Sequence, residues 1–422
     1  MRLLLAFPFF PYPPNDGGRI GFFNPIKYLS RTHEVTVFSL AGDGEATAVE
    51  ELKRLGVNVC VFRRPSGGDA YRLMRGAVWF PPGAGARYWH PAAGDLIRRT
   101  IATLRPDLVE FHHLNMAIYR KFAGSVPAVL REHNVEYKVW ERYAANDSSW
   151  IEKGYVKWTA PRVRKYEADA ASRFDRCVVV SAADAAHLRA VSPRARIEVI
   201  PSGVDTEYFF PIRDVPSEPF SITLTSSFAW KPRHHSLFTL LTVIFPRIRA
   251  RVPNANLYIV GKGMPEHLER IGRQIPGVTI VGPVPDVRPY IARSALLINY
   301  LECGGGIALK VLEAMAMRKP ILCNSLACEG IPTTQGKDIF IADGPEAFAS
   351  AAAYLLQNEP IGMRIAEGAY QLALEKYSWK HLASEFSNCF AQIVEERAGG
   401  KHVAQPKWRT LYEESPRGHQ SS

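Results

Sequence analysis

The sequence has few cysteines and no long apolar segment. Its 422 residues include six cysteines, which lack the spacing of a zinc site or of a disulfide-rich secreted domain. No apolar run approaches the roughly 18–20 residues that span a bilayer. Prolines from Pro8 onward interrupt the apolar stretch that begins at Leu3, so we expect no signal peptide. These absences exclude a disulfide scaffold, a zinc finger and a membrane-spanning protein, and they favour a soluble cytoplasmic chain.

The composition that remains is that of an ordinary globular protein with excess positive charge. Hydrophobic residues make up 47% and charged residues 22% of the chain, which excludes disordered and fibrous classes. The length suits two domains of about 150–200 residues each. Lysine and arginine number 52 against 41 acidic residues, for a net charge of +11. The excess predicts an anionic partner, such as a nucleotide, a nucleic acid or membrane headgroups.

Short apolar runs alternate with helical stretches along the whole chain. The runs are apolar on both faces, as buried parallel strands are, so the pattern predicts doubly wound α/β domains. The proline-rich segment 211–219 is expected to link two such domains. We expect domains at 1–205 and 220–378, a final helix at 379–396 and a poorly ordered tail at 397–422. The predicted strands lie at 3–7, 35–38, 57–62, 108–111, 128–131, 177–181, 197–200, 222–226, 256–260, 278–281, 296–300, 321–324 and 339–341.

Two loops after predicted strands of the first half carry candidate binding groups. Gly17 and Gly18 allow close backbone approach at the start of a helix, and Arg19 adds charge for an anion. An ordinary turn is the alternative interpretation. His133 follows the strand at 128–131 and can exchange a hydrogen bond with a sugar hydroxyl, although a structural loop histidine is the simpler alternative. Glu136 is expected at the start of the following helix, where the helix dipole favours an acid.

The third loop lies in the second half and is the most informative. Gly304, Gly305 and Gly306 precede a helix that carries Lys310 and, three residues on, Glu313 on the same face. Free backbone amides and a lysine suit a diphosphate, and a carboxylate one turn later suits ribose hydroxyls. The alternative is a glycine-rich helix start with a surface Lys–Glu pair.

These loops and several other segments together resemble the retaining glycosyltransferases of family 4, also called glycosyl transferases group 1. The resemblance covers roughly residues 1–396 and implies the GT-B fold. In that fold, two Rossmann-like doubly wound domains face a central cleft, and a C-terminal helix packs back on the first domain. The similar segments are PYPPNDGGRIGFF at 11–23, HNVE at 133–136, EVIPSGVDTEYF at 198–209, YIVGKG at 258–263, VTIVGPVPDV at 278–287 and EAMAMRKP at 313–320.

The resemblance implies a role for each matching residue. His133 contacts the donor sugar near its anomeric centre, Lys310 contacts the diphosphate, and Glu313 holds the nucleotide ribose. These three form the expected catalytic set. The backbone of 283–286 borders the base. The expected donor-binding residues are Gly17, Gly18, Arg19, Ser227, Lys231, Arg233, Lys262, Val284, Gly304, Gly305 and Gly306.

The sequence predicts no metal ion and no cofactor, because the nucleotide sugar is itself a substrate. No Asp-x-Asp motif and no His/Cys cluster is present. Cys323 and Cys328 lack C-x2-C spacing and neighbouring histidines, so they are expected to be core thiols.

The chain departs from the family pattern at several positions. Gly305 stands where the usual Glu-x7-Glu motif has its first glutamate, as in relatives of the GGG type. Such relatives often carry arginine where Glu302 and Ala308 stand. The Arg/Lys pair common after the first strand of the second domain is replaced by 226–235, where Lys231 and Arg233 are candidates for the missing charge.

The expected function is that of a retaining glycosyltransferase that moves a sugar from a nucleotide-sugar donor to a glycan or lipid-linked acceptor. The family resemblance places such enzymes in cell-surface polysaccharide or glycolipid synthesis. Two alternatives stay open: a sugar-nucleotide epimerase or hydrolase, and a catalytically silent GT-B protein that acts as a binding or partner subunit.

Most of the excess charge falls in the first half of the sequence. Residues 63–105 hold eight arginines against two aspartates, with aromatic residues between them. This segment suits an anionic membrane surface on the inner face of the membrane, or it is a solvated face. No nucleic-acid partner is expected, because no recognised binding motif accompanies the charge.

Overall fold

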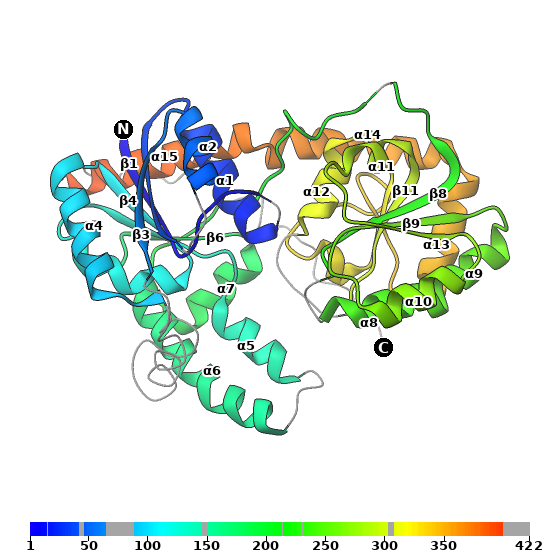
Figure 1. Cartoon of the computed structure of the whole chain (residues 1–422), viewed down its shortest axis with the longest axis horizontal. Coiled ribbons are helices and arrows are strands. Elements are labelled where there is room, and N and C mark those ends of the chain that lie inside the picture. The colour runs from blue at the N-terminus through cyan, green and yellow to red at the C-terminus, as the bar shows by residue number, and fades with distance from the viewer. Residues whose placement is uncertain are drawn as a thin grey trace, which may run out of the picture. The chain divides into compact units, whose positions relative to one another are not determined.

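Strands form at all thirteen apolar runs named above. The computed structural model describes residues 1–14, 16–41, 46–64, 88–145, 150–212, 214–228, 232–302 and 308–399. Within these residues, seven strands form one sheet and six form another. The expectation of two Rossmann-like α/β domains is therefore confirmed, and Figure 1 shows the two sheets with helices on both faces of each.

The chain divides into two units that interleave in sequence. The N-terminal unit comprises Met1–Tyr12, Leu29–Ile200 and the chain from Glu385 onward, and the C-terminal unit comprises Pro13–Tyr28 and Pro201–Ser384. The segment 13–28, expected within the first domain, thus groups with the second. One reason is Asp205, which accepts hydrogen bonds from Lys27 at 2.6 Å and from Tyr28 at 2.8 Å.

The N-terminal sheet is entirely parallel and has the order β3-β2-β1-β4-β5-β6-β7. Its direction of winding reverses between β1 and β4, which are neighbours although β2 and β3 separate them in sequence. The strands are β1 (Arg2–Phe7), β2 (Glu34–Ala41), β3 (Asn58–Arg63), β4 (Leu108–His112), β5 (Ala128–Arg131), β6 (Arg176–Val179) and β7 (Ile197–Val199).

One face of this sheet carries a large hydrophobic cluster of the unit. Val109 and Phe111 of β4 pack there with residues of α4, η2, α6 and α7. The side chains between them in sequence point to the other face, because successive residues of a strand alternate. The helices are α2 (Ala46–Arg54), α4 (Pro91–Leu104), the 3-10 helix η2 (Leu114–Phe122), α5 (Glu136–Ala145), α6 (Trp150–Ala171) and α7 (Ala182–Val191).

The C-terminal sheet is also parallel, in the order β10-β9-β8-β11-β12-β13. Both of its faces are covered, since Leu296 and Ile298 of β11 face one apolar cluster and Leu297 faces another. Cys323 and Cys328 lie in the second cluster, as expected of core thiols. The strands are β8 (Glu218–Thr225), β9 (Asn256–Val260), β10 (Val278–Gly282), β11 (Ser294–Asn299), β12 (Ile321–Cys323) and β13 (Phe340–Ile341).

Strand β8 begins inside the segment expected to be a linker. Glu218 pairs with Ser294 of β11, and its carboxylate accepts a hydrogen bond of 2.7 Å from the Tyr258 hydroxyl. The linker therefore ends earlier than the predicted 211–219. The helices of the unit are α1 (Gly17–Leu29, grouped here as far as Tyr28), α8 (Pro232–Thr239), the π-helix η3 (Leu240–Ile244), α9 (Phe245–Arg251), α10 (Glu266–Gln274), α11 (Arg288–Arg293), α12 (Leu309–Ala316), the 3-10 helix η4 (Ser325–Cys328), α13 (Pro345–Gln357), α14 (Glu359–Leu372) and the π-helix η5 (Ala373–Tyr377).

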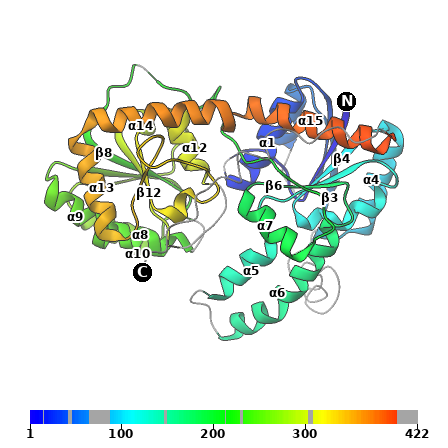
Figure 2. The same ribbon diagram turned by 180° about the vertical axis from the view of Figure 1, so that it is seen from behind.

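The last helix, α15 (Trp379–Arg397), starts in the C-terminal unit and continues into the N-terminal unit. Figure 2 shows it from behind as one continuous helix. From Glu385 onward it contacts the N-terminal unit: Glu396 forms ion pairs of 3.0 and 2.8 Å with Arg176 and Arg196. The expected return of the final helix to the first domain is thus observed. The tail that is predicted to be poorly ordered comprises residues 397–422, and its residues from 400 onward lie outside the described part of the chain.

No helix in the part of the chain that the structure describes combines the length and the apolar character needed to cross a membrane.

Candidate active site

Candidate residues in each unit lie after the two strands at which the sheet reverses its winding or after a strand next to them. The two strands are β8 and β11 in the C-terminal sheet and β1 and β4 in the N-terminal sheet, where His133 follows β5, the neighbour of β4. Open parallel sheets bind ligands outside the carboxyl ends of their strands at this topological switch point.

The loop after β8 places a half-buried cation at the switch point of the C-terminal unit. The Arg233 guanidinium donates to the Ser226 hydroxyl at 3.3 Å. Burial alone lowers the pKa of Arg233, and no acidic side chain in the described part of the chain contributes to that shift. A guanidinium that has no acidic partner among the described residues, close after the carboxyl end of a parallel strand, is suited to an anionic ligand.

Close backbone contacts fix the shape of this loop. Gly261 has a φ of +149°, and a Cβ atom there would lie 1.7 Å from the Ser226 carbonyl oxygen. The backbone N–H of Phe228 donates to the carbonyl of Lys262 at 2.8 Å, which joins the loops after β8 and β9. Only glycine fits at position 261, so the YIVGKG segment has a structural reason for its glycine.

The start of α12 carries the predicted Lys–Glu pair. Lys310 Nζ lies 3.0 Å from both carboxylate oxygens of Glu313. The Glu313 side chain is only 4% exposed, whereas that of Lys310 is 32% exposed. The pair is therefore more than a solvated surface contact. A buried carboxylate is held by a lysine whose side chain is still partly exposed.

The glycine loop lies next to α12. A Cβ on Gly17, the first residue of α1, would be 4.0 Å from Leu309 Cδ1. Asp16 accepts the backbone N–H of Arg19 at 2.9 Å and the Arg19 guanidinium at 2.7 Å, so it caps α1. Gly18 is exposed beside it. The charge of Arg19 is thus partly offset by its own helix cap.

The remaining predicted donor-binding residues have mixed surroundings. Ser227 and Val284 are half-buried, and Lys262 is exposed. Lys231 and the glycines 304–306 lie outside the described residues.

Glu302, at the position where related sequences often have arginine, is held by α8. Its carboxylate accepts a hydrogen bond of 3.1 Å from Thr239 and lies 3.4 Å from His235. Its backbone N–H donates to Ser236 at 2.9 Å. The acid therefore has a defined structural position close after β11.

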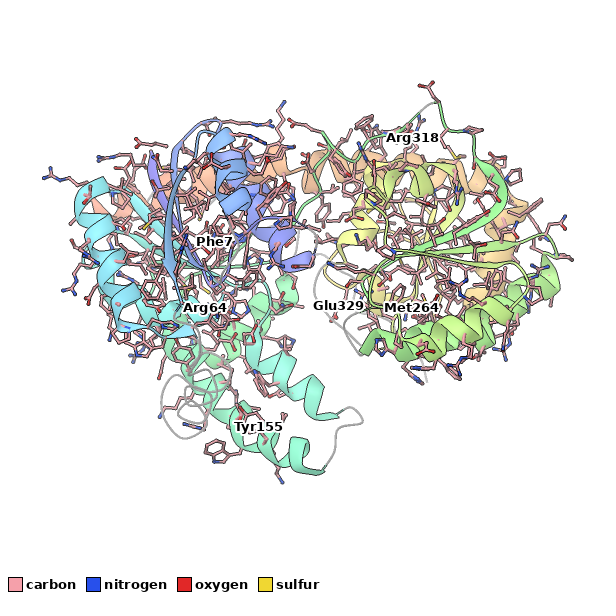
Figure 3. All side chains as sticks on the ribbon, viewed as in Figure 1. Phe7, Arg64, Tyr155, Met264, Arg318 and Glu329 are labelled. Atoms are coloured by element: carbon pink, nitrogen blue, oxygen red, sulfur yellow. The ribbon has the colours of Figure 1, made fainter. Side chains whose placement is uncertain are left out.

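In the N-terminal unit, His133 belongs to a line of three polar side chains. Its Nε2 lies 3.5 Å from Nδ1 of His112, and the two rings stack at a centroid distance of 5.7 Å. The Nε2 of His112 lies 3.0 Å from a carboxylate oxygen of Glu110. Both Glu110 and His112 are fully buried, while His133 is half-buried. Phe7, at the end of β1, stacks on His112 at 4.1 Å and lies inside this unit in Figure 3.

A buried arginine sets the electrostatics of this line. Arg131 is fully buried, and its guanidinium lies 4.2 Å from the Phe386 ring of α15. Burial lowers its pKa to about 10, which leaves it charged at neutral pH. Burial and the charge of Arg131 hold the pKa of His133 well below its usual range. Burial likewise lowers the pKa of His112, although Glu110 opposes that shift.

The next residues of the HNVE segment build the start of α5. Glu167 of α6 accepts the backbone N–H groups of Glu136 and Tyr137 at 2.7 and 2.9 Å, and so caps the helix. Glu136 does open α5, but its carboxylate lies 3.2 Å from the His113 ring. Burial raises the pKa of Glu132 well above its usual value, and the neighbouring Glu167 raises it further.

Sequence reasoning did not identify Glu110, His112, Arg131, Glu132 and Glu167 as candidates. Glu110 and His112 interrupt an apolar strand at alternate positions, and that spacing was the available signal, since such residues share one face. Glu167 is far along the chain from the helix that it caps and offered no local signal.

Among the described residues, no group of three or more His, Cys, Asp or Glu side chains is arranged to hold a metal ion.

Comparison with known proteins assigns both halves of the chain to domains of one enzyme class. Residues 23–208 match the domain "Glycosyltransferase Family 4", and residues 219–358 match the domain "Glycosyl transferases group 1". These two domains, together with the pair of parallel-sheet units, define the chain as a glycosyltransferase of the GT-B class.

Individual relatives are distant. An uncharacterized 44.6 kDa protein in the cps region of Klebsiella pneumoniae is 21% identical over 90% of this chain and 97% of its own. Sucrose-phosphate synthase from Thermosynechococcus elongatus has a TM-score of 0.71 at 16% identity, over 94% of this chain and 100% of that one.

Two further solved structures share the fold. HepE from Anabaena, in complex with UDP and glucose, has a TM-score of 0.65 at 16% identity, over 92% of this chain and 99% of that one. WaaG, a glycosyltransferase involved in lipopolysaccharide biosynthesis, has a TM-score of 0.63 at 14% identity, again over 92% and 99%.

Proposed function

We propose that the protein is a retaining glycosyltransferase that moves a sugar from a nucleotide-diphosphate donor to a glycan or lipid-linked acceptor. The single observation that carries the proposal is that two cationic side chains lie at the switch point of the C-terminal unit. Arg233 and Lys310 follow β8 and β11, the two strands where a doubly wound sheet binds its ligand. The UDP bound in the HepE structure belongs to that protein, and it supports a nucleotide sugar as the donor class for this fold.

In the proposed reaction the nucleotide diphosphate leaves and the acceptor hydroxyl attacks the same face of the sugar. The sugar gains cationic character in the transition state while negative charge grows on the diphosphate. Lys310 and Arg233 stabilise that charge, and each such preorganised donor is typically worth about 3–4 kcal/mol of barrier. Glu313, held by Lys310, accepts hydrogen bonds from the ribose hydroxyls.

The N-terminal unit contacts the sugar and the acceptor in this proposal. His133 is neutral at physiological pH because its pKa is held low, so it acts as a hydrogen-bonding group and not as a charge. A neutral imidazole suits a sugar hydroxyl next to a centre that becomes cationic. A second cation there would oppose the developing charge.

The acceptor side of the proposal is cell-surface polysaccharide or glycolipid synthesis, with the protein on the inner face of the membrane. The genomic setting of the Klebsiella relative and the pathway of WaaG support this context. Much of the arginine-rich segment 63–105 lies outside the described residues, but in α4 Arg98 and Arg99 are exposed.

A second basic surface of the N-terminal unit supports membrane contact. On α6, Tyr155 and Trp158 are 40% and 48% exposed, and Arg162 lies 4.4 Å from the Trp158 ring. Lys165 continues the same helical face, and no acidic residue occurs from Gly154 to Tyr166. Figure 3 shows Tyr155 on a hairpin of α5 and α6 that extends away from the sheet of the unit. Exposed aromatic rings and cations together suit an anionic bilayer surface.

Ligand-induced stabilisation tests the donor. UDP-, GDP- and ADP-sugars are screened for thermal stabilisation, and a ligand at 100 times its dissociation constant adds roughly 2.7 kcal/mol. Turnover is then measured with and without lipid-linked acceptors. Turnover that needs no acceptor favours an epimerase or hydrolase, and binding without turnover favours a partner subunit. If no nucleotide or nucleotide sugar stabilises the protein, the donor site is wrong.

Sedimentation with vesicles tests the membrane contact. The protein is expected to bind vesicles that contain phosphatidylglycerol and not vesicles of phosphatidylcholine alone. Trp158→Ser combined with Lys165→Ser should reduce that binding without changing thermal stability. Equal binding by the variant would remove α6 from the proposed surface.

A further inference from the structure

The line Glu110–His112–His133 connects the half-buried histidine to a fully buried carboxylate. Glu110 and His112 lie two residues apart on β4, so their side chains share one face of the sheet. His133 follows β5, the neighbouring strand, whose Arg131 is in register with His112. The contacts of 3.0 and 3.5 Å form a continuous path from the interior of the unit to its strand ends.

The charges and distances of the three groups favour one arrangement of protons. The carboxylate of Glu110 attracts a proton and cannot donate one, so the proton of a neutral His112 is favoured on Nε2, the ring nitrogen that lies 3.0 Å from Glu110. The Nδ1 of a neutral His112 is then an acceptor. The Nε2 of His133, 3.5 Å away, is placed to donate to it. A neutral His133 that is protonated on Nε2 has an unprotonated Nδ1, which is an acceptor.

The surroundings keep each group in the state that this arrangement needs. His112 and Arg131 lower the pKa of Glu110 against the opposing effect of burial, so Glu110 is ionised. Burial lowers the pKa of both His112 and His133, and Arg131 lowers both further, so both rings are neutral. His113 also faces this cluster, but its ring lies 3.2 Å from Glu136, outside the line.

Packing holds the line in place on both sides. The Phe7 ring stacks on His112 at an angle of 27°, which fixes the plane of the imidazole. The Phe386 ring of α15 covers the Arg131 guanidinium at 4.2 Å. The stack therefore limits tilting of the His112 imidazole out of its plane.

We propose that Glu110 and His112 are positioning residues that fix His133 in the tautomer whose Nδ1 accepts a hydrogen bond from a hydroxyl of the bound sugar. The proposal rests on the proposed function for the identity of that hydroxyl. The tautomer itself is a property of the unliganded protein. Carboxylates that orient a functional imidazole through its second nitrogen act in this way in many sites.

Nitrogen NMR of the full-length protein with 15N-labelled histidine tests the tautomer directly. The signals of His133 are assigned by their loss in His133→Asn, a change at a half-buried position. The expected result in the wild type is a protonated Nε2 and an unprotonated Nδ1. A protonated Nδ1 on His133 overturns the proposal without any variant of a buried residue.

Glu110→Gln then tests the origin of the tautomer. The amide can face His112 with either its oxygen or its nitrogen, so His133 is expected to become a mixture of tautomers. Glu132→Gln is the matched control, because it neutralises a buried carboxyl one residue from His133 that lies outside the line. It should leave the tautomer unchanged. An unmixed tautomer in folded Glu110→Gln overturns the role of Glu110.

Kinetics test whether the tautomer matters. Glu110→Gln should lower kcat about tenfold to a hundredfold, as losses of orienting partners do, with KM for the donor changed less than about twofold. In a His133→Ala background the same change should cost nothing further. An equal loss with and without His133 overturns the positioning role. If the wild type transfers no sugar, the proposed function fails while the NMR result still decides the tautomer.

Discussion

The polar side chains at the switch points of the two sheets differ in charge and in burial. At the switch point of the C-terminal unit, Arg233 has no acidic partner among the described residues, and Lys310 remains accessible while it holds Glu313. At the switch point of the N-terminal unit, the polar groups are buried and lie close to one another, as Glu110 lies 3.0 Å from His112. Under the proposed function, the first site receives the charged diphosphate and the second receives the neutral sugar.

In the proposed reaction, this difference assigns separate tasks to the two domains. Cations near the surface can exchange solvent for the oxygens of a diphosphate with little reorganisation. In the buried cluster of the N-terminal unit, burial and the charge of Arg131 lower the pKa of His133 and so keep that imidazole in one protonation state. We therefore expect variants of the two units to affect different steps.

The largest effect should come from Lys310→Ala. Removing the ammonium takes away a preorganised donor to the leaving diphosphate, so turnover should fall by about 10²–10³. Affinity for the nucleotide diphosphate should weaken as well, as measured by calorimetry. Arg270→Ala is the control, because Arg270 is an exposed arginine of the same unit that pairs with Glu266 on its own helix.

The buried Glu313 complicates that variant, because it loses its partner. The double variant Lys310→Met with Glu313→Gln removes both charges and should regain thermal stability without regaining turnover. Recovery of turnover in the double variant would show that the pair is structural, and the contrast between the units would disappear.

His133→Ala should separate the units more sharply. A hydrogen bond to a polar group of the substrate is worth about 1–3 kcal/mol, so kcat should fall about tenfold to a hundredfold. The dissociation constant of the nucleotide diphosphate alone should change less than about twofold, since the C-terminal unit binds it. A large loss of nucleotide affinity in His133→Ala would contradict the division between the units.

The sheets could be predicted from sequence because buried parallel strands are apolar on both faces. All thirteen runs became strands, and the only notable shift was β8, which begins at Glu218 inside the expected linker. That strand is longer because Glu218 finds partners on β9 and β11, which are far away in sequence.

The candidate site could be predicted only in part. Lys310 and Glu313 meet through local helical spacing, which a sequence displays. The Glu110–His112–His133 line depends on the register of two neighbouring strands, and the cap by Glu167 depends on how α6 packs on α5. Such contacts come from tertiary packing and leave almost no trace in local sequence.

A smaller effect, on stability, should come from Glu132→Gln. Burial raises the pKa of Glu132 and raises that of Glu167 to about 7, so the folded protein binds protons more tightly than the unfolded chain. The stabilisation from this pair is complete below about pH 4.5 and is lost as the pH rises through about 7. Glutamine is neutral at all these pH values and can still donate to Glu167.

The variant should therefore gain about 1–2 kcal/mol of unfolding free energy relative to the wild type at pH 8, and little or none at pH 5. Urea unfolding between pH 5 and pH 8 measures the difference. Glu141→Gln on α5 neutralises an exposed acid paired with Lys138 and should leave the pH dependence unchanged. If Glu132→Gln keeps the wild-type pH dependence, another group titrates. The claim that the N-terminal interior holds the titrating pair would then be wrong.

The smallest effect should come from Glu302→Gln, which should strengthen the binding of the nucleoside diphosphate, whereas Lys310→Ala should weaken it. Glu302 is an acid close after β11, on the side of the sheet where a diphosphate is expected, so its charge opposes ligand binding. Thr239 can donate to the oxygen of a glutamine side chain as well, and Ser236 accepts the backbone N–H of residue 302, so the loop should keep its shape. The Glu302 side chain is 26% exposed, so salt screens the repulsion and the gain should stay below about 1 kcal/mol. Affinity for a nucleoside diphosphate should rise about twofold to fivefold at low ionic strength.

That gain should shrink in high salt, whereas a gain independent of salt would point to a change in loop shape and not in charge. Unchanged or weaker binding at low salt would mean that the anion does not approach this end of the C-terminal sheet, and the charge contrast between the units would then need another explanation.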